Sequence, residues 1–151
     1  MPANTLQLFT GVPNCGFAAA ITAANTAKDG TGTTSLIFTA NATYGSRVDR
    51  IRAQALGTNV ASVARIFINN GGTPATASNN VLYANFSLPA TTGTENAGLA
   101  LAEVPNNATI VDSTAFPIAL PPGYRIYVCI GTAVASGWQF VATGGDFNIA
   151  A

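Results

Sequence analysis

At residues 80–89 the chain reads NVLYANFSLP, and this stretch decides the fold. Apolar side chains recur at every second position from Leu82 to Leu88, and the positions between them hold tyrosine, asparagine and serine. Successive side chains of a strand point to opposite sides, so this alternation predicts a strand with one buried face. Pro89 ends the strand, because proline has no N–H to donate to a neighbouring strand.

Short runs of the same kind, separated by turn residues such as those at 69–72, fill most of the chain. Besides 80–88, we expect strands at residues 33–40, 47–56, 61–69, 116–120, 124–131, 137–143 and 147–149, while 98–104 is a short strand or a helical turn. This pattern predicts an all-β protein, a two-sheet antiparallel β-sandwich of jelly-roll-like type with about 8–9 strands. Residues 30–151 form the sandwich, and residues 1–29 are an N-terminal arm or a first strand.

The chain carries little charge: 8% of its 151 residues are charged, against about 25% in an average soluble protein. Its six basic and six acidic residues balance, which argues against electrostatic binding of nucleic acid. No apolar run approaches the ~20 residues of a membrane span. Residues 1–9 lack the basic and long apolar regions of a signal peptide, so we expect no routine secretion.

Catalysis is not expected either. The chain has no histidine, which excludes a Ser-His-Asp triad, a Cys-His pair and a His-ligated zinc site within it. The spacing of the acidic residues indicates no carboxylate pair of the glycosidase kind, and Asp146 has no acidic neighbour in sequence for a calcium site. We therefore expect no catalytic residue, no metal and no cofactor. Cys15 and Cys129 lie beside apolar residues, so we expect both thiols to be reduced and buried.

Several strands carry apolar side chains on both faces. In the run at 61–69, Val63 and Phe67 alternate with Ile66 and Ile68. The outer face of a sandwich strand in a monomer is usually polar. We therefore expect a neighbouring subunit to cover such a face, with a loop of the same chain as the alternative.

The one concentration of charge is a group of four arginines around Asp49. In a regular strand Arg50 and Arg52 share one face, and Arg47 shares the other with Asp49. A planar guanidinium suits an ion pair across a subunit contact; a solvated strand face and a phosphate-binding patch are the alternatives. The outward tyrosine of the strand at 80–88 is also a candidate for stacking on a sugar. The interface candidates are Arg47, Arg50, Arg52, Arg65, Phe67 and Tyr83.

Several motifs, mostly turns and strand ends, follow one another between residues 30 and 147. They read DRIR at 49–52, ALGTNVA at 55–61, RIFINNG at 65–71, LPAT at 88–91, LPPGY at 120–124, GW at 137–138 and GGDF at 144–147. In this order and spacing the chain resembles a family of small proteins found among the virion structural genes of tailed bacteriophages. The resemblance implies a small β-sandwich virion component and supplies no catalytic residues.

The same resemblance implies a capsid decoration (cement) protein on the capsid surface of the virion, assembled in the host cytoplasm. A tail- or fibre-associated protein, or a carbohydrate-binding module for host attachment, is the alternative. The expected partners are further copies of the chain, as a homotrimer, and the major capsid protein, with no nucleic acid and no membrane. Many simultaneous contacts would stabilise a shell, because each one raises the effective concentration for the next.

Overall fold

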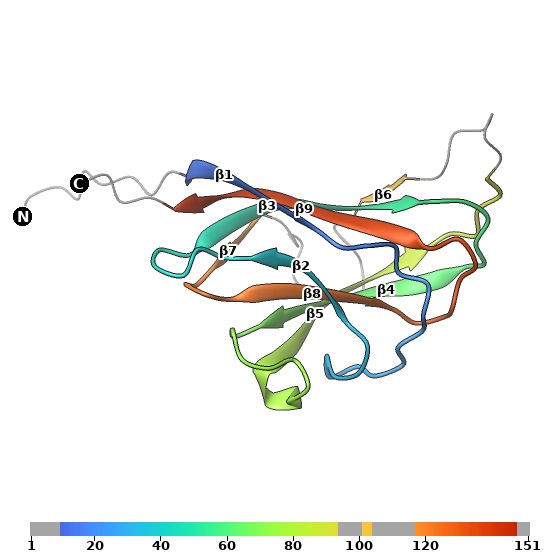
Figure 1. Ribbon diagram of the computed structural model, residues 1–151, viewed down its shortest axis with the longest axis horizontal. Helices are drawn as coiled ribbons and strands as arrows, with labels where there is room; N and C mark the ends of the chain where they lie inside the picture. The colour runs from blue at the N-terminus through green and yellow to red at the C-terminus, as the bar shows by residue number, and fades with distance from the viewer. Residues whose placement is uncertain (1–9, 94–100, 104–116, 148–151) are drawn as a thin grey trace, which may run out of the picture.

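The computed structural model of the chain describes residues 10–93, 101–103 and 117–147 (Figure 1). These residues form strands and loops, with one short 3-10 turn, η1 (Ala77–Asn79). The strands are β1 (Thr10–Phe17), β2 (Ser35–Thr39), β3 (Ser46–Ala55), β4 (Ser62–Asn69), β5 (Asn80–Leu88), β6 (Leu101–Glu103), β7 (Ile118–Leu120), β8 (Arg125–Ile130) and β9 (Trp138–Phe147). In the described part of the chain no helix is long and apolar enough to cross a membrane.

The antiparallel strand pairs are nested inside one another. β1 pairs with β9, β2 with β8, β3 with β6 and β7, and β4 with β5. One long hairpin gives this nesting when it is rolled up, and the rolling places β9 beside β3 and β8 beside β4. The result is a jelly roll of two sheets. The first sheet has the order β1-β9-β3-β6 with β7 also on β3, and the second has the order β2-β8-β4-β5.

The core fills the space between the two sheets, which Figure 1 shows as an upper and a lower layer. Trp138, Phe140 and Phe38 are among its largest fully buried side chains. Phe140 of β9 meets Phe86 of β5 edge to face, with 6.3 Å between ring centroids, so the two sheets are joined by a favourable aromatic contact. The prediction of a two-sheet antiparallel β-sandwich is confirmed.

In the second sheet, two β-bulges move side chains away from the face that alternation predicts. In β2 the register shifts between Leu36 and Phe38. Ile37 and Phe38 are therefore both buried, while Leu36 is 42% exposed. Strict alternation over residues 33–40 places Leu36 on the same inward face as Phe38, and this prediction is wrong because a bulge inserts one unpaired residue.

A second bulge shifts the register between β4 and β5 at Phe67. Phe67 pairs with Leu82, and the two side chains pack together on the outer side of the second sheet. Tyr83, expected on the outer face, is half-buried and packs against the main core instead. The predicted directions of Leu82 and Tyr83 are thus wrong for the same physical reason.

Strand β9 runs without interruption through Gly144 and Gly145, where we expected a break and a new strand at 147–149. Gly144 pairs with residues of both neighbouring strands. A Cβ at this position would overlap the carbonyl oxygen of Arg47, so the glycine permits a close approach of two strands. Residues 148–149 lie outside the described residues, and the open choice at 98–104 resolves as the short strand β6.

From Thr10 onward the N-terminal segment belongs to the sandwich. β1 is an edge strand of the first sheet, paired with β9 along its length. Ala18 and Ile21, which follow it, are buried in the main core. The part of the predicted arm at residues 1–9 lies outside the described residues.

Candidate functional site

Segment 18–34 of the chain, which connects β1 to β2, lies over part of the outer face of the second sheet (Figure 1). Asn25 anchors this segment: its backbone N–H donates to the carbonyl of Ile130 (2.8 Å), and its carbonyl accepts a hydrogen bond from Nη1 of Arg65 (2.8 Å). Its buried side-chain amide donates to two carbonyls further along the segment (2.8 and 3.0 Å). Asn25 is buried, but these hydrogen bonds pair its polar atoms, so burying them costs little free energy.

Under this cover lies a second apolar cluster, made by Phe67, Tyr127 and Cys129 with Leu82 packed against it. Phe67 is 0% exposed in the single chain. For Phe67 the alternative of cover by the same chain therefore applies, whereas Val63 on the same face is 37% exposed, and its cover by a neighbouring subunit stays a prediction. Burial also raises the pKa of the Cys129 thiol. Two of the interface candidates thus have other positions than we expected. Phe67 is buried, and Arg65 bonds to segment 18–34.

Arg65 gives the first testable prediction, because it holds the cover in place. Replacing Arg65 by alanine should lower the free energy of unfolding by about 1–3 kcal/mol, since the carbonyl of Asn25 loses a charged donor. Cys129 beneath it should then react faster with a thiol reagent in the native protein. Urea unfolding and the labelling rate of Cys129 measure the two effects.

Arg50→Ala is the matched control for Arg65→Ala. Arg50 is exposed on the other sheet, so we expect a change within about 0.5 kcal/mol and no change at Cys129. Equal losses of stability in the two variants would contradict the anchoring role of Arg65.

On the first sheet, a β-bulge at Asp49 brings three arginines onto one face. The register between β3 and β9 shifts between Val48 and Arg50. Arg47, Arg50 and Arg52 therefore all project to the solvent side of the sheet, while Val48 is fully buried. The prediction that Arg47 and Asp49 face away from Arg50 and Arg52 is wrong. Asp49 is an extra, unpaired residue in β3, so the residues on either side of the bulge point to the same side of the sheet.

Cross-strand pairing sets these arginines in rows with side chains of β9 and β1. One row runs from Phe17 through Val141 to Arg52, and directly paired residues lie on the same side of a sheet. Phe17 is 71% exposed, more than any other large apolar side chain among the described residues. We call this surface the arginine face; its residues are Cys15, Phe17, Arg47, Arg50, Arg52, Gln54, Gln139, Val141 and Thr143.

The arginine face is modestly cationic on a chain whose net charge is zero. Arg47 Nε contacts Asp49 Oδ1 at 2.8 Å, and both side chains are about half exposed, so this ion pair contributes about 0–1 kcal/mol. Glu103 of β6 stands opposite Arg52 in the backbone register. Among the side chains that the structure describes on this side of the sheet, three arginines stand against one acidic residue, Asp49.

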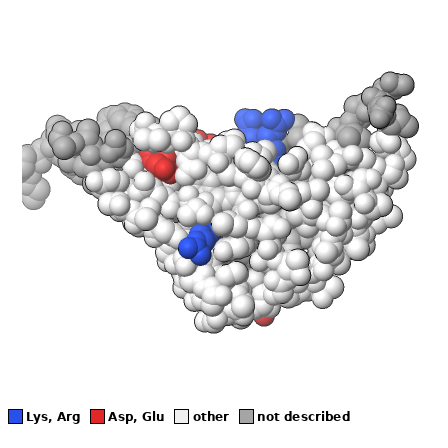
Figure 2. Space-filling model, viewed as in Figure 1, with Lys and Arg blue, Asp and Glu red and all other residues white. Residues whose placement is uncertain are grey.

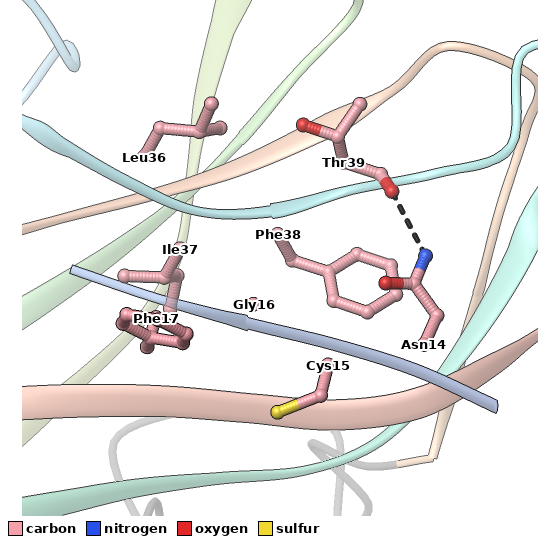
Figure 3. A pocket seen from close by; sticks show the side chains of 8 residues that line it. All are labelled: Asn14, Cys15, Gly16, Phe17, Leu36, Ile37, Phe38 and Thr39. Atoms are coloured by element: carbon pink, nitrogen blue, oxygen red, sulfur yellow. Dashed lines mark hydrogen bonds between the residues drawn. The ribbon is translucent and has the colours of Figure 1, made fainter.

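The open edge of the sandwich, where β1 and β2 contact each other, has a different character. Figure 2 shows a surface with few charged groups in the same view as Figure 1. Val12 and Leu36 are exposed on these two strands. A groove of about 250 Å³ lies between β1 and β2 (Figure 3). It is closed at one end, where Asn14 Nδ2 donates to the carbonyl of Thr39 (3.1 Å).

The acidic side chains of the described residues have structural roles. Asp146 Oδ1 accepts hydrogen bonds from Asn14 Nδ2 (2.7 Å) and from the hydroxyl of Ser46, so it joins β1, β3 and β9. The hydroxyl and N–H of Thr31 donate to Asp29 and hold the pKa of that carboxyl below its ordinary value. Within the described ranges no three His, Cys, Asp or Glu side chains gather as metal ligands would.

The two cysteines are free and differ in environment. Cys129 is buried, as expected, but Cys15 is exposed on the arginine face, so the prediction of burial is wrong for Cys15. Its neighbour Phe17 is the surface residue that sequence reasoning missed. The only signal was an aromatic residue in a segment without regular alternation, because the outward direction of Phe17 follows from its pairing with Val141.

Comparison of the chain with protein-family models, with curated proteins and with solved structures found no match. The fold and the surfaces define the protein as a jelly-roll sandwich in which its own segment 18–34 lies over part of one outer sheet face, while the arginine face is open to solvent.

Proposed function

We propose that this chain is a structural virion protein of a tailed bacteriophage, a capsid decoration protein that binds the major capsid protein and has no catalytic role. The observation that carries the proposal is the contrast between the two sheets. On the second sheet the outward Phe67, Tyr127 and Cys129 are buried, and Arg65 beside them bonds to segment 18–34, whereas the arginine face leaves Phe17 largely exposed. An exposed aromatic side chain beside arginines is typical of a protein contact rather than of a solvated surface.

The fold supports the same proposal. Jelly rolls are common in viral capsid proteins and in lectins, so the fold fits the decoration role without specifying it. The sequence resemblance to virion proteins of tailed bacteriophages favours the first of these two classes. The sugar-stacking candidate of the second, Tyr83, is half-buried against the core, which disfavours it as a platform for a sugar ring.

Further copies of the chain are the second partner that we propose, in a homotrimer. The open edge of β1 and β2 supports this, because it exposes Val12 and Leu36 and has few charges to desolvate. In a trimer with closed cyclic symmetry, every protomer would bury this edge against a neighbour, and no such edge would stay exposed. Sedimentation of the purified chain should show a trimer, and a monomer at high concentration would contradict this part of the proposal.

The main test is the number of copies in purified virions, measured by quantitative mass spectrometry. A decoration protein should be present in numbers comparable to the major capsid protein and should bind isolated shells. A few copies per virion would point to the tail or a fibre instead. Affinity for glycans without affinity for shells would point to the carbohydrate-binding alternative.

A further inference from the structure

We infer that the arginine face docks on an acidic protein surface, with Phe17 as the apolar anchor of the contact. The inference deepens the proposed function and rests on it where the acidic surface is taken to belong to the capsid shell. It starts from the row in which Phe17, Val141 and Arg52 lie side by side on three adjacent strands.

The composition of the face indicates a protein partner. Aromatic residues and arginine contribute most often to the binding energy of protein interfaces, and here they adjoin on a rigid sheet. Phe17 is held by pairing between β1 and β9, and the arginines are held by β3 at the centre of the same sheet. Little ordering is therefore required when a partner binds, which favours affinity.

The charge of the face selects the kind of partner. Three arginines outnumber Asp49, the one acidic side chain that the structure describes on this face, so a surface rich in carboxylates is complementary to it. A second copy is a poor occupant, because a twofold axis through this face would set arginines against arginines. Nucleic acid is a poor occupant as well, because three arginines on a neutral chain release few counterions.

The arrangement depends on the bulge at Asp49. In a regular strand Arg47 would point into the sandwich, and the face would hold two arginines. The bulge thus places an additional positive charge beside Gly145, to which Arg47 is paired. Bulges that redirect a side chain are a known way to build a functional surface from a sheet.

The first experiment titrates the isotope-labelled chain with an acidic, leucine-containing peptide and follows amide chemical shifts by NMR. We expect the shifts to cluster on β1, β3 and β9, near Phe17 and Arg50. Raising the salt concentration from about 0.05 M to about 0.3 M should weaken binding, because exposed charges are screened. Shifts spread evenly over both sheets, or tighter binding of a DNA duplex than of the peptide, would overturn the inference.

The second experiment measures binding to phage shells prepared without this protein. Arg50→Glu and Phe17→Ser should each lower the affinity by about tenfold or more. The matched controls are Lys28→Glu, in segment 18–34, and Val81→Ser, at an exposed position of β5; both should stay within about twofold. Circular dichroism and urea unfolding establish that all four variants fold.

The two experiments separate the inference from the proposed function. Suppose that the wild-type chain does not bind shells, while the peptide still shifts residues of the arginine face. The proposed capsid role would then be wrong, and the inference that this face binds acidic proteins would stand. Suppose instead that the wild-type chain and the variants Arg50→Glu and Phe17→Ser bind shells with equal affinity. The proposed capsid role would then stand, and the inference about the arginine face would be overturned.

Discussion

Replacing Gly144 by alanine is expected to lower the free energy of unfolding by about 3 kcal/mol or more. The added Cβ would overlap the carbonyl oxygen of Arg47 and lie 2.9 Å from the Cα of Val48. Both are backbone atoms of the central strand β3, which cannot rotate away as a side chain can. For a chain of this length the loss corresponds to a decrease in Tm of roughly 6–12 °C. Urea unfolding followed by the fluorescence of the single, buried Trp138 measures it.

Thr143→Ala is the control for Gly144→Ala, because Thr143 is the preceding residue of β9 and is exposed. Its truncation should change stability by no more than about 0.5 kcal/mol. A Gly144→Ala variant as stable as Thr143→Ala would show that β9 and β3 have room to separate, and the close approach would then not be a constraint on the sheet.

Replacing Asn59 by alanine is the second large effect that we expect, a loss of about 2–4 kcal/mol. The side chain is 3% exposed and connects the loop after β3 to the loop before β9. Its Nδ2 donates to the carbonyl of Gly137 (3.1 Å), and its Oδ1 accepts from the N–H groups of Ser136 and Gly137 (both 2.9 Å). Alanine leaves the N–H groups of Ser136 and Gly137 without this acceptor where water has little access, and each unpaired group costs free energy. The carbonyl of Gly137 keeps the hydrogen bond from the N–H of Leu56 (3.1 Å). Thermal and urea unfolding measure the loss.

Asn70→Ala is the matched control, since Asn70 is an exposed asparagine in another turn. Its Oδ1 accepts the N–H of Gly72 (3.0 Å), a bond that water can replace. We expect a loss of less than about 1 kcal/mol. If Asn59→Ala cost no more than Asn70→Ala, the loops would be held together by other contacts.

The strands were largely predictable from the sequence because alternation reports directly on burial. The stretch at 80–88 coincides with β5, and the runs at 47–56 and 61–69 match β3 and β4 within a residue at each end. The predictions that failed lie at bulges and at Gly144. Local patterns carry no sign of a bulge, because the unpaired residue is determined by the register of the neighbouring strand.

The candidate site was less predictable than the fold. The four arginines were chosen for their closeness in sequence, yet Arg65 lies on the opposite sheet, bonded to Asn25. Phe67 was chosen for an outward direction that it has, but it is buried in a cluster with Tyr127 and Cys129. Phe17 was not chosen, because no alternation surrounds it. What surrounds a side chain depends on chain segments far away in sequence, which periodicity does not report.

The sequence alone determined that this protein is a β-sandwich of low charge and without histidine chemistry, because periodicity, turn residues and composition are local properties. Only the tertiary structure decided that the arginines of β3 share one face with Phe17, and that Phe67 on the second sheet is buried within its own chain. These features depend on strand register and on the path of segment 18–34, and both result from contacts between residues distant in the chain.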